Sequence, residues 1–319
     1  MSGPDDGIDG TGAAGPAGTA LRVHVGPKAP EPLVEAVRGA GAAIVPADEA
    51  EALVWFGGPA DELRTYLHPG VRWVQLPSAG VESYLAAGVL TGDRVFTSAA
   101  GCYAHSVAEH TLAMMLAAAR RLPELARART WTSPEPVSLR GARVVIVGAG
   151  GIGQALIALL GPFDADIVAI TRSGRAVPGA RVCTTPDRLH DVLADADFVV
   201  VAAPSTARTS ALVGARELAL MPSTAWLVNV ARGTLVDTDA VVAALRSGEI
   251  GGAALDVTDP EPLPDGHPLW SERRALITPH SANPLSLRLP RLAERVGHNT
   301  ARFARGEPLE GVVDPSAGY

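Results

Sequence analysis

A short apolar strand that leads directly into a glycine-rich turn constrains the fold of this chain more than any other feature. Residues 143–147 read RVVIV, residues 148–153 read GAGGIG, and a helix is expected to continue over residues 154–160. This order of strand, G-x-G-x-x-G turn and helix separates a dinucleotide site from a chance cluster of glycines. The sequence therefore predicts a nucleotide-binding βα unit in the middle of the chain.

The positions of this turn have distinct physical roles in binding a dinucleotide. Gly148 permits the tight turn, Gly150 lets the backbone approach a pyrophosphate, and Gly153 lets the helix pack closely on its strand. The helix N-terminus, where Gly151 and Ile152 lie, offers free N–H groups and the positive end of a dipole. We therefore expect all five residues to bind the cofactor.

Short apolar runs alternate with amphipathic segments along the chain, which is the pattern of parallel α/β sheets. At 319 residues the chain is long enough for about two domains. Six of the runs follow Gly141, and six strands are what a complete Rossmann domain needs. The expected strands are 21–25, 43–45, 52–56, 71–76 and 95–97, then 143–147, 167–171, 198–202, 226–229, 253–257 and 276–278.

These runs predict an α/β protein with a Rossmann cofactor-binding domain over residues 105–282 and a smaller, flavodoxin-like α/β substrate domain. The substrate domain is discontinuous, because an amphipathic helix near the C-terminus is expected to return to it. Its segments are 19–104 and 283–319, and we expect the active site in the cleft between the domains. Residues 1–18, rich in Gly, Ala and Pro, are expected to form a disordered tail.

Composition and charge exclude several classes of function. The net charge is −7 and the isoelectric point is about 5.6, whereas nucleic-acid binders carry a basic face. Cys102 and Cys183 match neither a metal-ligand spacing nor a disulfide framework, so we expect reduced thiols in a cytoplasmic protein. No apolar run approaches about 18 residues, and the chain does not start like a signal peptide, so no membrane association is expected.

A long helix is expected over residues 107–121. Ser106, followed three residues later by Glu109, has the spacing of a capping box that would start this helix. Large apolar side chains and a histidine on such a helix more often pack than carry chemistry. On this helix we expect His110, Met114 and Met115 to pack. Elsewhere in the chain, Trp131 and Trp270 could line the pocket, but packing is the more common role of large aromatics and is expected for both.

An arginine, a carboxylate and a histidine follow the last three expected strands. The carboxyl ends of parallel strands meet at one edge of the sheet, where such sheets bind ligands. Arg232 can hold a carboxylate or keto oxygen with two hydrogen bonds, and His280 can donate a proton near neutral pH. Glu261 beside the imidazole would favour its charged form. Together with a nicotinamide, these groups are what the reduction of a 2-keto acid by hydride needs.

The turn after the second expected Rossmann strand predicts a preference for NADPH over NADH. An NAD-selective site carries Asp or Glu about 20 residues past the glycines, whereas this turn has Arg172 at that place and no carboxylate beside it. Thr171 and Ser173 can donate hydroxyl hydrogen bonds to a 2′-phosphate. Arg172 and Arg175 bring positive charge that suits the same group.

Several short motifs follow one another in a fixed order along the chain. Besides the glycine turn, they are VAEH from Val107, NVARG from Asn229, DVTDPEPLP from Asp256, PLW from Pro268 and TPH from Thr278. This series resembles the D-isomer-specific 2-hydroxyacid dehydrogenase family, and within it the glyoxylate/hydroxypyruvate reductase branch. The resemblance runs from about Val71 to the C-terminus and is weaker before that.

The resemblance implies catalytic roles and an assembly. Arg232 would bind and polarise the substrate, His280 would be the acid/base, and Glu261 would be the partner of His280. It also implies a homodimer with the Ala- and Met-rich helix over residues 107–121 at its interface. The cofactor would be NADP, which is preferred, or NAD.

Further residues are assigned to the substrate and the cofactor through the same resemblance. Ser78, Ala79 and Gly80 match a loop whose backbone N–H groups hold the substrate carboxylate. Asp256 matches a position that contacts the nicotinamide side of the cofactor. The remaining residues assigned to the cofactor site are Pro204, Thr209, Val230 and Ala231.

Three functions remain open at this point. The first is the NAD(P)H-dependent reduction of a small 2-keto acid, of the glyoxylate or hydroxypyruvate type, to the D-2-hydroxy acid. The second is a dehydrogenase of the same fold that acts on a bulkier or phosphorylated hydroxy acid. The third is a nucleotide-sensing binding protein with little turnover.

Overall fold

The computed structural model describes residues 20–316, which divide into two compact units. Unit 1 contains the described residues up to Cys102 and from Arg288 onward, and unit 2 is Tyr103–Leu287. The boundaries expected from the sequence were 104/105 and 282/283, against 102/103 and 287/288 in the structure. The tail expected over residues 1–18 lies outside the described residues.

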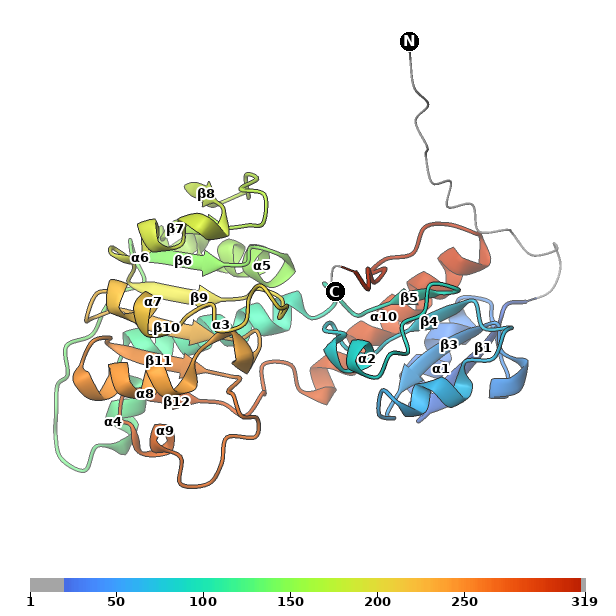
Figure 1. Ribbon diagram of the computed structural model, residues 1–319, viewed down its shortest axis with the longest axis horizontal. Helices are drawn as coiled ribbons and strands as arrows, with labels where there is room; N and C mark the ends of the chain where they lie inside the picture. Colours follow the sequence, from blue (N-terminus) through green and yellow to red (C-terminus); the bar gives the residue numbers. More distant parts are fainter. Residues whose placement is uncertain (1–19, 317–319) are drawn as a thin grey trace, which may run out of the picture. The chain divides into compact units, whose positions relative to one another are not determined.

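Unit 1 contains a five-stranded parallel sheet and its helices. Its elements are β1 (Arg22–Pro27), α1 (Glu31–Gly39), β2 (Ala43–Ile44), η1 (Ala47–Glu49), β3 (Ala52–Phe56), η2 (Glu62–Tyr66), β4 (Trp73–Gln75), α2 (Glu82–Ala86), β5 (Val95–Thr97) and the part of α10 (Leu285–Ala304) that follows Leu287. The strand order β2-β1-β3-β4-β5 is the flavodoxin-like order that the sequence predicted, and β1, β3, β4 and β5 are labelled in Figure 1.

The centre of the unit 1 sheet is buried on both faces. Every residue of β3 is buried, and Leu53 and Trp55 pack with Val74 and Phe96 in one apolar cluster. A strand that is buried on both faces reads as a continuous apolar run, which is why these strands could be predicted. An antiparallel bridge between Thr97 and Val312 adds the C-terminal segment to the edge of β5.

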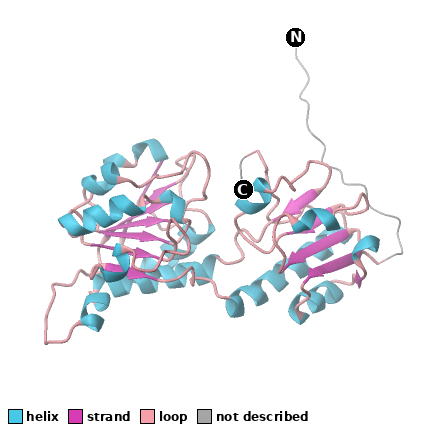
Figure 2. Ribbon diagram, turned by 60° about the horizontal axis from the view of Figure 1, so that its bottom comes forward, coloured by secondary structure: helices cyan, strands magenta, loops and turns pink. Residues whose placement is uncertain are grey.

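Unit 2 is a seven-stranded parallel sheet with helices on both faces (Figure 2). Its elements are α3 (Ala104–Ala119), α4 (Leu122–Arg127), β6 (Arg143–Val147), α5 (Gly151–Leu160), η3 (Gly161–Phe163), β7 (Asp166–Ile170), β8 (Val182–Thr184), η4 (Pro186–Arg188), α6 (His190–Leu193), β9 (Phe198–Val201), α7 (Ala215–Leu220), β10 (Trp226–Asn229), η5 (Gly233–Leu235), α8 (Thr238–Ser247), β11 (Gly252–Leu255), α9 (Pro268–Ser271) and β12 (Ala275–Ile277). The order β8-β7-β6-β9-β10-β11-β12 is the Rossmann order with one strand added beyond β11.

The prediction of six strands for this sheet was wrong, because it missed β8. This strand has three residues, pairs with β7 alone, and has no fully buried residue. An edge strand that faces solvent need not be apolar, so it leaves no hydrophobic run in the sequence. The strand order reverses between β6 and β9, and open α/β sheets bind ligands at such a reversal.

The capping box predicted at Ser106 and Glu109 is not formed, because α3 begins three residues earlier. Its N-cap is Tyr103, without a side-chain hydrogen bond, and Ser106 lies inside the helix. The methionines at 114 and 115 are 2% and 0% exposed, and α3 packs on α5, β10 and β11. The Met-rich face of α3, which was expected at a homodimer interface, therefore packs within its own unit.

Candidate active site

The β6–α5 turn has the geometry that the glycine pattern predicted. Gly148 has a φ of +97°, and a Cβ there would lie 2.5 Å from the backbone nitrogen of Ala203. A Cβ on Gly153 would lie 2.7 Å from the carbonyl oxygen of Gly148. Packing therefore requires glycine at both positions, whereas a Cβ on Gly150 would meet nothing within 4 Å.

The open space at Gly150 lies at the start of α5 and suits an anion. Gly150 is the N-cap of this helix, and no side chain caps it. The first amides of a helix, here those of Gly151, Ile152 and Gly153, have no partner within the helix. Such amides and the helix dipole favour a pyrophosphate, so these residues fit a dinucleotide.

The turn after β7 offers hydroxyl and cationic groups. Arg172, Ser173 and Arg175 are exposed on it. The hydroxyl oxygen of Thr171 is buried and has no hydrogen-bond partner among residues 20–316. A buried polar atom without a partner is costly, and a phosphate oxygen would supply the acceptor that this hydroxyl lacks. The turn therefore fits the 2′-phosphate of NADP.

The loops after β9 and β10 are held by side-chain hydrogen bonds. The hydroxyl of Thr209 donates to the carbonyl oxygen of Pro204 at 2.8 Å. In the next loop, Asn229 accepts from the amide of Ala231 at 3.1 Å and donates to the carbonyl oxygen of Arg232 at 2.9 Å. Asn229 is fully buried, and Val230 and Ala231 are also buried, so this loop has a defined conformation.

The loop that carries Arg232 is locked against the loop after β11. A Cβ on Gly233 would lie only 1.9 Å from the carbonyl oxygen of Thr258, so no other residue fits there. Arg232 itself has extended backbone and is partly exposed, and one of its terminal nitrogens donates to the carbonyl oxygen of Ala231 at 2.8 Å. The loop that carries Arg232 is therefore held in one conformation at the carboxyl end of β10.

The structure brings His280 and Glu261 together. The Nδ1 atom of His280 lies 2.7 Å from an oxygen of Glu261, and the side chains are 52% and 44% exposed. Glu261 follows β11 and His280 follows β12, and these strands are neighbours in the sheet. Because the carboxylate holds Nδ1, the second ring nitrogen, Nε2, is the atom left to exchange a proton with a ligand.

Asp256, which the resemblance assigned to the nicotinamide side, has its carboxylate engaged within unit 2. The residue is 2% exposed, and its oxygens accept hydrogen bonds from the hydroxyl of Thr278 and the amides of Ser281 and Ala282. Burial opposes ionisation, but these bonds and one from His110 outweigh it and hold the pKa of Asp256 below its ordinary value. The carboxylate is therefore charged at neutral pH.

The loop at Ser78, Ala79 and Gly80 follows β4 in unit 1. The hydroxyl of Ser78 donates to the carbonyl oxygen of Gly80 at 2.6 Å, and the carbonyl oxygen of Ser78 accepts from the amide of Ala99 at 2.8 Å. The loop therefore closes on itself and is tied to the segment after β5.

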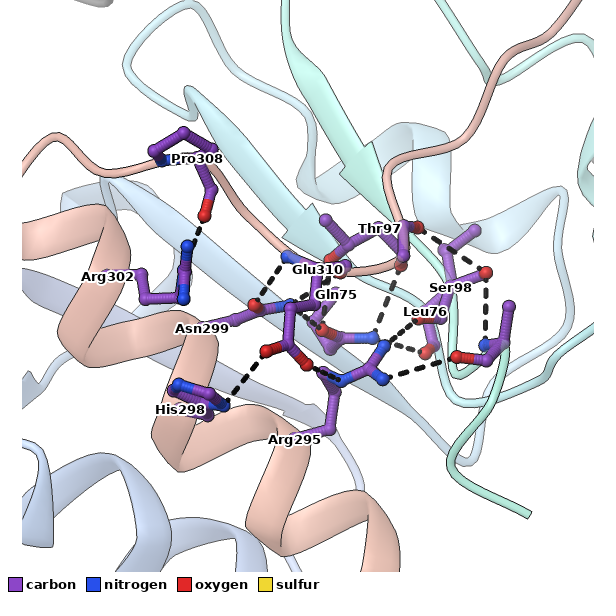
Figure 3. A network of polar contacts seen from close by, with 12 residues as sticks. Gln75, Leu76, Thr97, Ser98, Arg295, His298, Asn299, Arg302, Pro308 and Glu310 are labelled. Carbon is purple, nitrogen blue, oxygen red and sulfur yellow. Dashed lines mark hydrogen bonds and ion pairs between the residues drawn. The ribbon is translucent and has the colours of Figure 1, made fainter. Parts of the chain in front are cut away.

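A buried polar network supports the strands on either side of this loop (Figure 3). The side-chain oxygen of Gln75 accepts from Thr97 at 2.9 Å and from Asn299 on α10 at 3.0 Å. Asn299 also bonds both the amide and the carbonyl oxygen of Glu310, whose carboxylate pairs with Arg295 at 3.2 Å. Because Gln75 and Asn299 are fully buried, their satisfied amides give unit 1 one defined arrangement.

Comparisons with known proteins identify the family. Residues 112–282, more than half of the chain, match the D-isomer specific 2-hydroxyacid dehydrogenase, NAD binding domain. The chain belongs to this family. An uncharacterized protein of Corynebacterium melassecola is 40% identical to this dehydrogenase over 278 residues, which cover 83% of this chain and 89% of that protein.

Two further relatives carry more specific descriptions. Glyoxylate/hydroxypyruvate reductase B of Yersinia pestis is 31% identical over 281 residues, 84% of this chain and 85% of the reductase. The crystal structure of a D-isomer specific 2-hydroxyacid dehydrogenase from Xanthobacter autotrophicus Py2, in complex with NADPH and MES, has a TM-score of 0.83 and 30% identity. It covers 95% of this chain and 100% of that chain. The dehydrogenase described here is thus an NAD(P)-dependent oxidoreductase, as predicted from its motifs.

Other features of the dehydrogenase correct or complete the sequence analysis. Trp131 is 100% exposed and Trp270 is 45% exposed, so the prediction that both pack was wrong. Cys102 and Cys183 are free thiols. Over residues 20–316, no helix has both the length and the apolar character needed to cross a bilayer. In that same part of the chain, no cluster of three or more potential ligand side chains could hold a metal ion.

Proposed function

We propose that this dehydrogenase reduces a small 2-keto acid, of the glyoxylate or hydroxypyruvate type, to the D-2-hydroxy acid. The observation that carries the proposal is the 2.7 Å contact between Glu261 and His280, in the same unit as a glycine turn suited to a dinucleotide. Support for the substrate class comes from the relative in Yersinia pestis, which is described as a glyoxylate/hydroxypyruvate reductase.

The proposed chemistry assigns one task to each side chain. When bound, the reduced nicotinamide supplies the hydride that reaches the keto carbon. Nε2 of His280 donates its proton to the keto oxygen, and Glu261 stabilises the imidazolium through Nδ1. Arg232 binds the substrate carboxylate and polarises the keto group. We further propose that the amides of Ser78, Ala79 and Gly80 contact the substrate carboxylate.

Steady-state kinetics with a panel of 2-keto acids tests the function. With NADPH, kcat/KM should be highest for glyoxylate or hydroxypyruvate and lower for phenylpyruvate and for a phosphorylated keto acid. With the best substrate, kcat/KM for NADPH should exceed that for NADH. A bulkier acid as the best substrate would replace the proposed one, and NADPH binding without turnover of any acid would favour a sensor.

The cofactor preference is tested by changing the turn after β7. The double variant Thr171→Asp, Arg172→Ser introduces a carboxylate that repels a 2′-phosphate and can bond the ribose hydroxyls of NADH. The ratio of kcat/KM for NADPH over NADH should fall by at least about tenfold, the effect of one charge-assisted hydrogen bond. Arg188→Ser, an exposed arginine paired with Asp191, is the matched control and should leave the ratio unchanged. A wild-type enzyme that prefers NADH contradicts the proposal.

We also propose a homodimer that buries the apolar surface around α4. Leu122 is 50% exposed, Leu125 is 38% exposed and Trp131 is 100% exposed, and Leu116 on α3 adds to them at 37%. A second copy is the simplest partner because cyclic dimers are self-complementary. Sedimentation at micromolar concentration should give twice the chain mass of 32.8 kDa.

A double variant tests whether this surface is the interface. Leu125→Ser together with Trp131→Ser should shift sedimentation toward the single-chain mass, whereas Leu220→Ser, 38% exposed on α7, should not. A wild-type protein that sediments as one chain would reject the dimer, and a double variant that remains dimeric would place the interface elsewhere.

A further inference from the structure

The backbone at His280 is strained. Its φ is +50°, in the left-handed region that non-glycine residues rarely adopt. Such a conformation persists only where the surroundings determine it from several sides. One of the hydrogen bonds that hold this conformation is short: the amide of His280 donates to the carbonyl oxygen of Asp256 at 2.7 Å.

The next two residues are fixed by the carboxylate of the same aspartate. The amide of Ser281 lies 2.9 Å from Oδ1 of Asp256, and the amide of Ala282 lies 3.2 Å from Oδ2. A buried carboxylate is costly unless hydrogen bonds satisfy it, and this one is satisfied largely by the loop that follows His280. The position of this loop therefore depends on the position of one side chain.

Two side chains of α3 complete this arrangement. Nε2 of His110 lies 3.0 Å from the hydroxyl oxygen of Thr278 and 3.3 Å from Oδ1 of Asp256. One turn earlier, the hydroxyl of Ser106 donates to the carbonyl oxygen of Ala282 at 2.9 Å. The helix α3 thus holds residues on both sides of His280 in the chain, Thr278 and Ala282.

The neighbouring hydrogen-bond donors and acceptors determine which ring nitrogen of His110 carries a proton. Thr278 donates its hydroxyl proton to Asp256 at 2.6 Å, so its oxygen is left to accept from the imidazole. The second neighbour of Nε2 is the carboxylate of Asp256, which only accepts hydrogen bonds and therefore also requires a donor. Nε2 of His110 must therefore carry the hydrogen.

We propose that His110 is a positioning residue for the reduction. It holds Asp256 and Thr278 so that Nε2 of His280 is oriented toward the keto oxygen of the substrate. This inference rests on the proposed function, in which His280 donates the proton. Without the His110 donor, Asp256 loses one of its anchors and the loop after β12 can relax from its strained conformation. The proton donor is then misplaced, while the glycine turn that binds the cofactor is untouched.

Variants of His110 test the proposal by kinetics. His110→Leu removes the donor and should lower kcat about 10- to 100-fold, the range that a small misplacement of a catalytic group causes. The NADPH dissociation constant should change much less than kcat, because the glycine turn stays in place and only Asp256, on the nicotinamide side, is loosened. His110→Gln keeps an N–H donor and should recover most of the lost kcat. A merely structural histidine would lower thermal stability in both variants without this split.

The matched control is His190, whose imidazole also bonds a carboxylate, Glu217, at 2.7 Å in the same unit. His190→Leu removes a comparable pair at the start of α7 and should leave kcat unchanged. A wild-type kcat in His110→Leu overturns the proposal, and so does a loss in His110→Gln as large as in His110→Leu. If His280→Ala keeps full activity, the proposed function itself is wrong, which is a different outcome.

A spectroscopic measurement on the free protein does not depend on how the variants fold. With 15N-labelled histidine, the two ring nitrogens of His110 should give the signals of the Nε2–H tautomer or of the imidazolium. The signals of the Nδ1–H tautomer would show that Nε2 is not the donor, and the proposal would be rejected.

Discussion

Replacement of His280 by alanine is expected to lower kcat for keto-acid reduction about 10²- to 10⁴-fold, the usual contribution of a positioned acid or base. The expectation follows from Nδ1 of His280 being held 2.7 Å from Glu261, which leaves Nε2 as the proton donor. Steady-state kinetics and a fluorescence titration with NADPH would measure the change, and the NADPH dissociation constant should not move.

The backbone at this position needs its own control. His280 has a φ of +50°, and asparagine tolerates the left-handed region better than alanine does. His280→Asn should therefore fold at least as well as His280→Ala and lose the same activity, because neither side chain can donate the proton. Glu261→Gln should also lower kcat, because Nδ1 of His280 loses the carboxylate that holds it. If turnover survives all three changes, the acid lies elsewhere.

The second large effect is expected at Arg232. Arg232→Met should lower kcat/KM for the keto acid about 10²- to 10⁴-fold, because two charge-assisted hydrogen bonds are worth about 1.5–3 kcal/mol each. The loss should appear in the substrate parameters and not in the dissociation constant for NADPH. Steady-state kinetics with the best acid of the panel provides the measurement.

Two further variants separate charge from geometry in this prediction. Arg232→Lys keeps the positive charge but loses the planar fork, so it should recover only part of the activity. Arg181→Met removes an exposed arginine paired with Asp166 at the amino end of β7, the edge opposite to the candidate site, and should leave the kinetics unchanged. An Arg232→Met enzyme with wild-type kcat/KM would mean that another residue binds the substrate.

Much of the fold could be predicted because it depends on local patterns. The strands at Ala52–Phe56, Arg143–Val147 and Trp226–Asn229 have the predicted bounds, since a strand buried on both faces is a continuous apolar run. The glycine turn could be predicted for a similar reason, because steric limits on φ and on Cβ act within a few residues. The family resemblance, also carried by short motifs, was confirmed by the comparisons.

The errors occurred where local patterns compete or are missing. The Ser106 and Glu109 spacing fits a capping box, but α3 starts at Ala104 and turns Ser106 toward the carbonyl oxygen of Ala282. Trp131 was expected to pack because large aromatics usually do, and yet it is fully exposed. Neither outcome could be read from neighbouring residues.

The sequence by itself determined which residue types stand at the carboxyl ends of the strands, because chain order and strand periodicity place them there. Only the tertiary structure decided which of them touch. His110 and Thr278 are 168 residues apart in the chain, and Ser106 and Ala282 are 176 residues apart. Hydrogen bonds of this kind have no periodicity or motif, since they form only after helices and strands have packed. The support of the His280 loop is therefore a property of the folded unit and not of any segment of it.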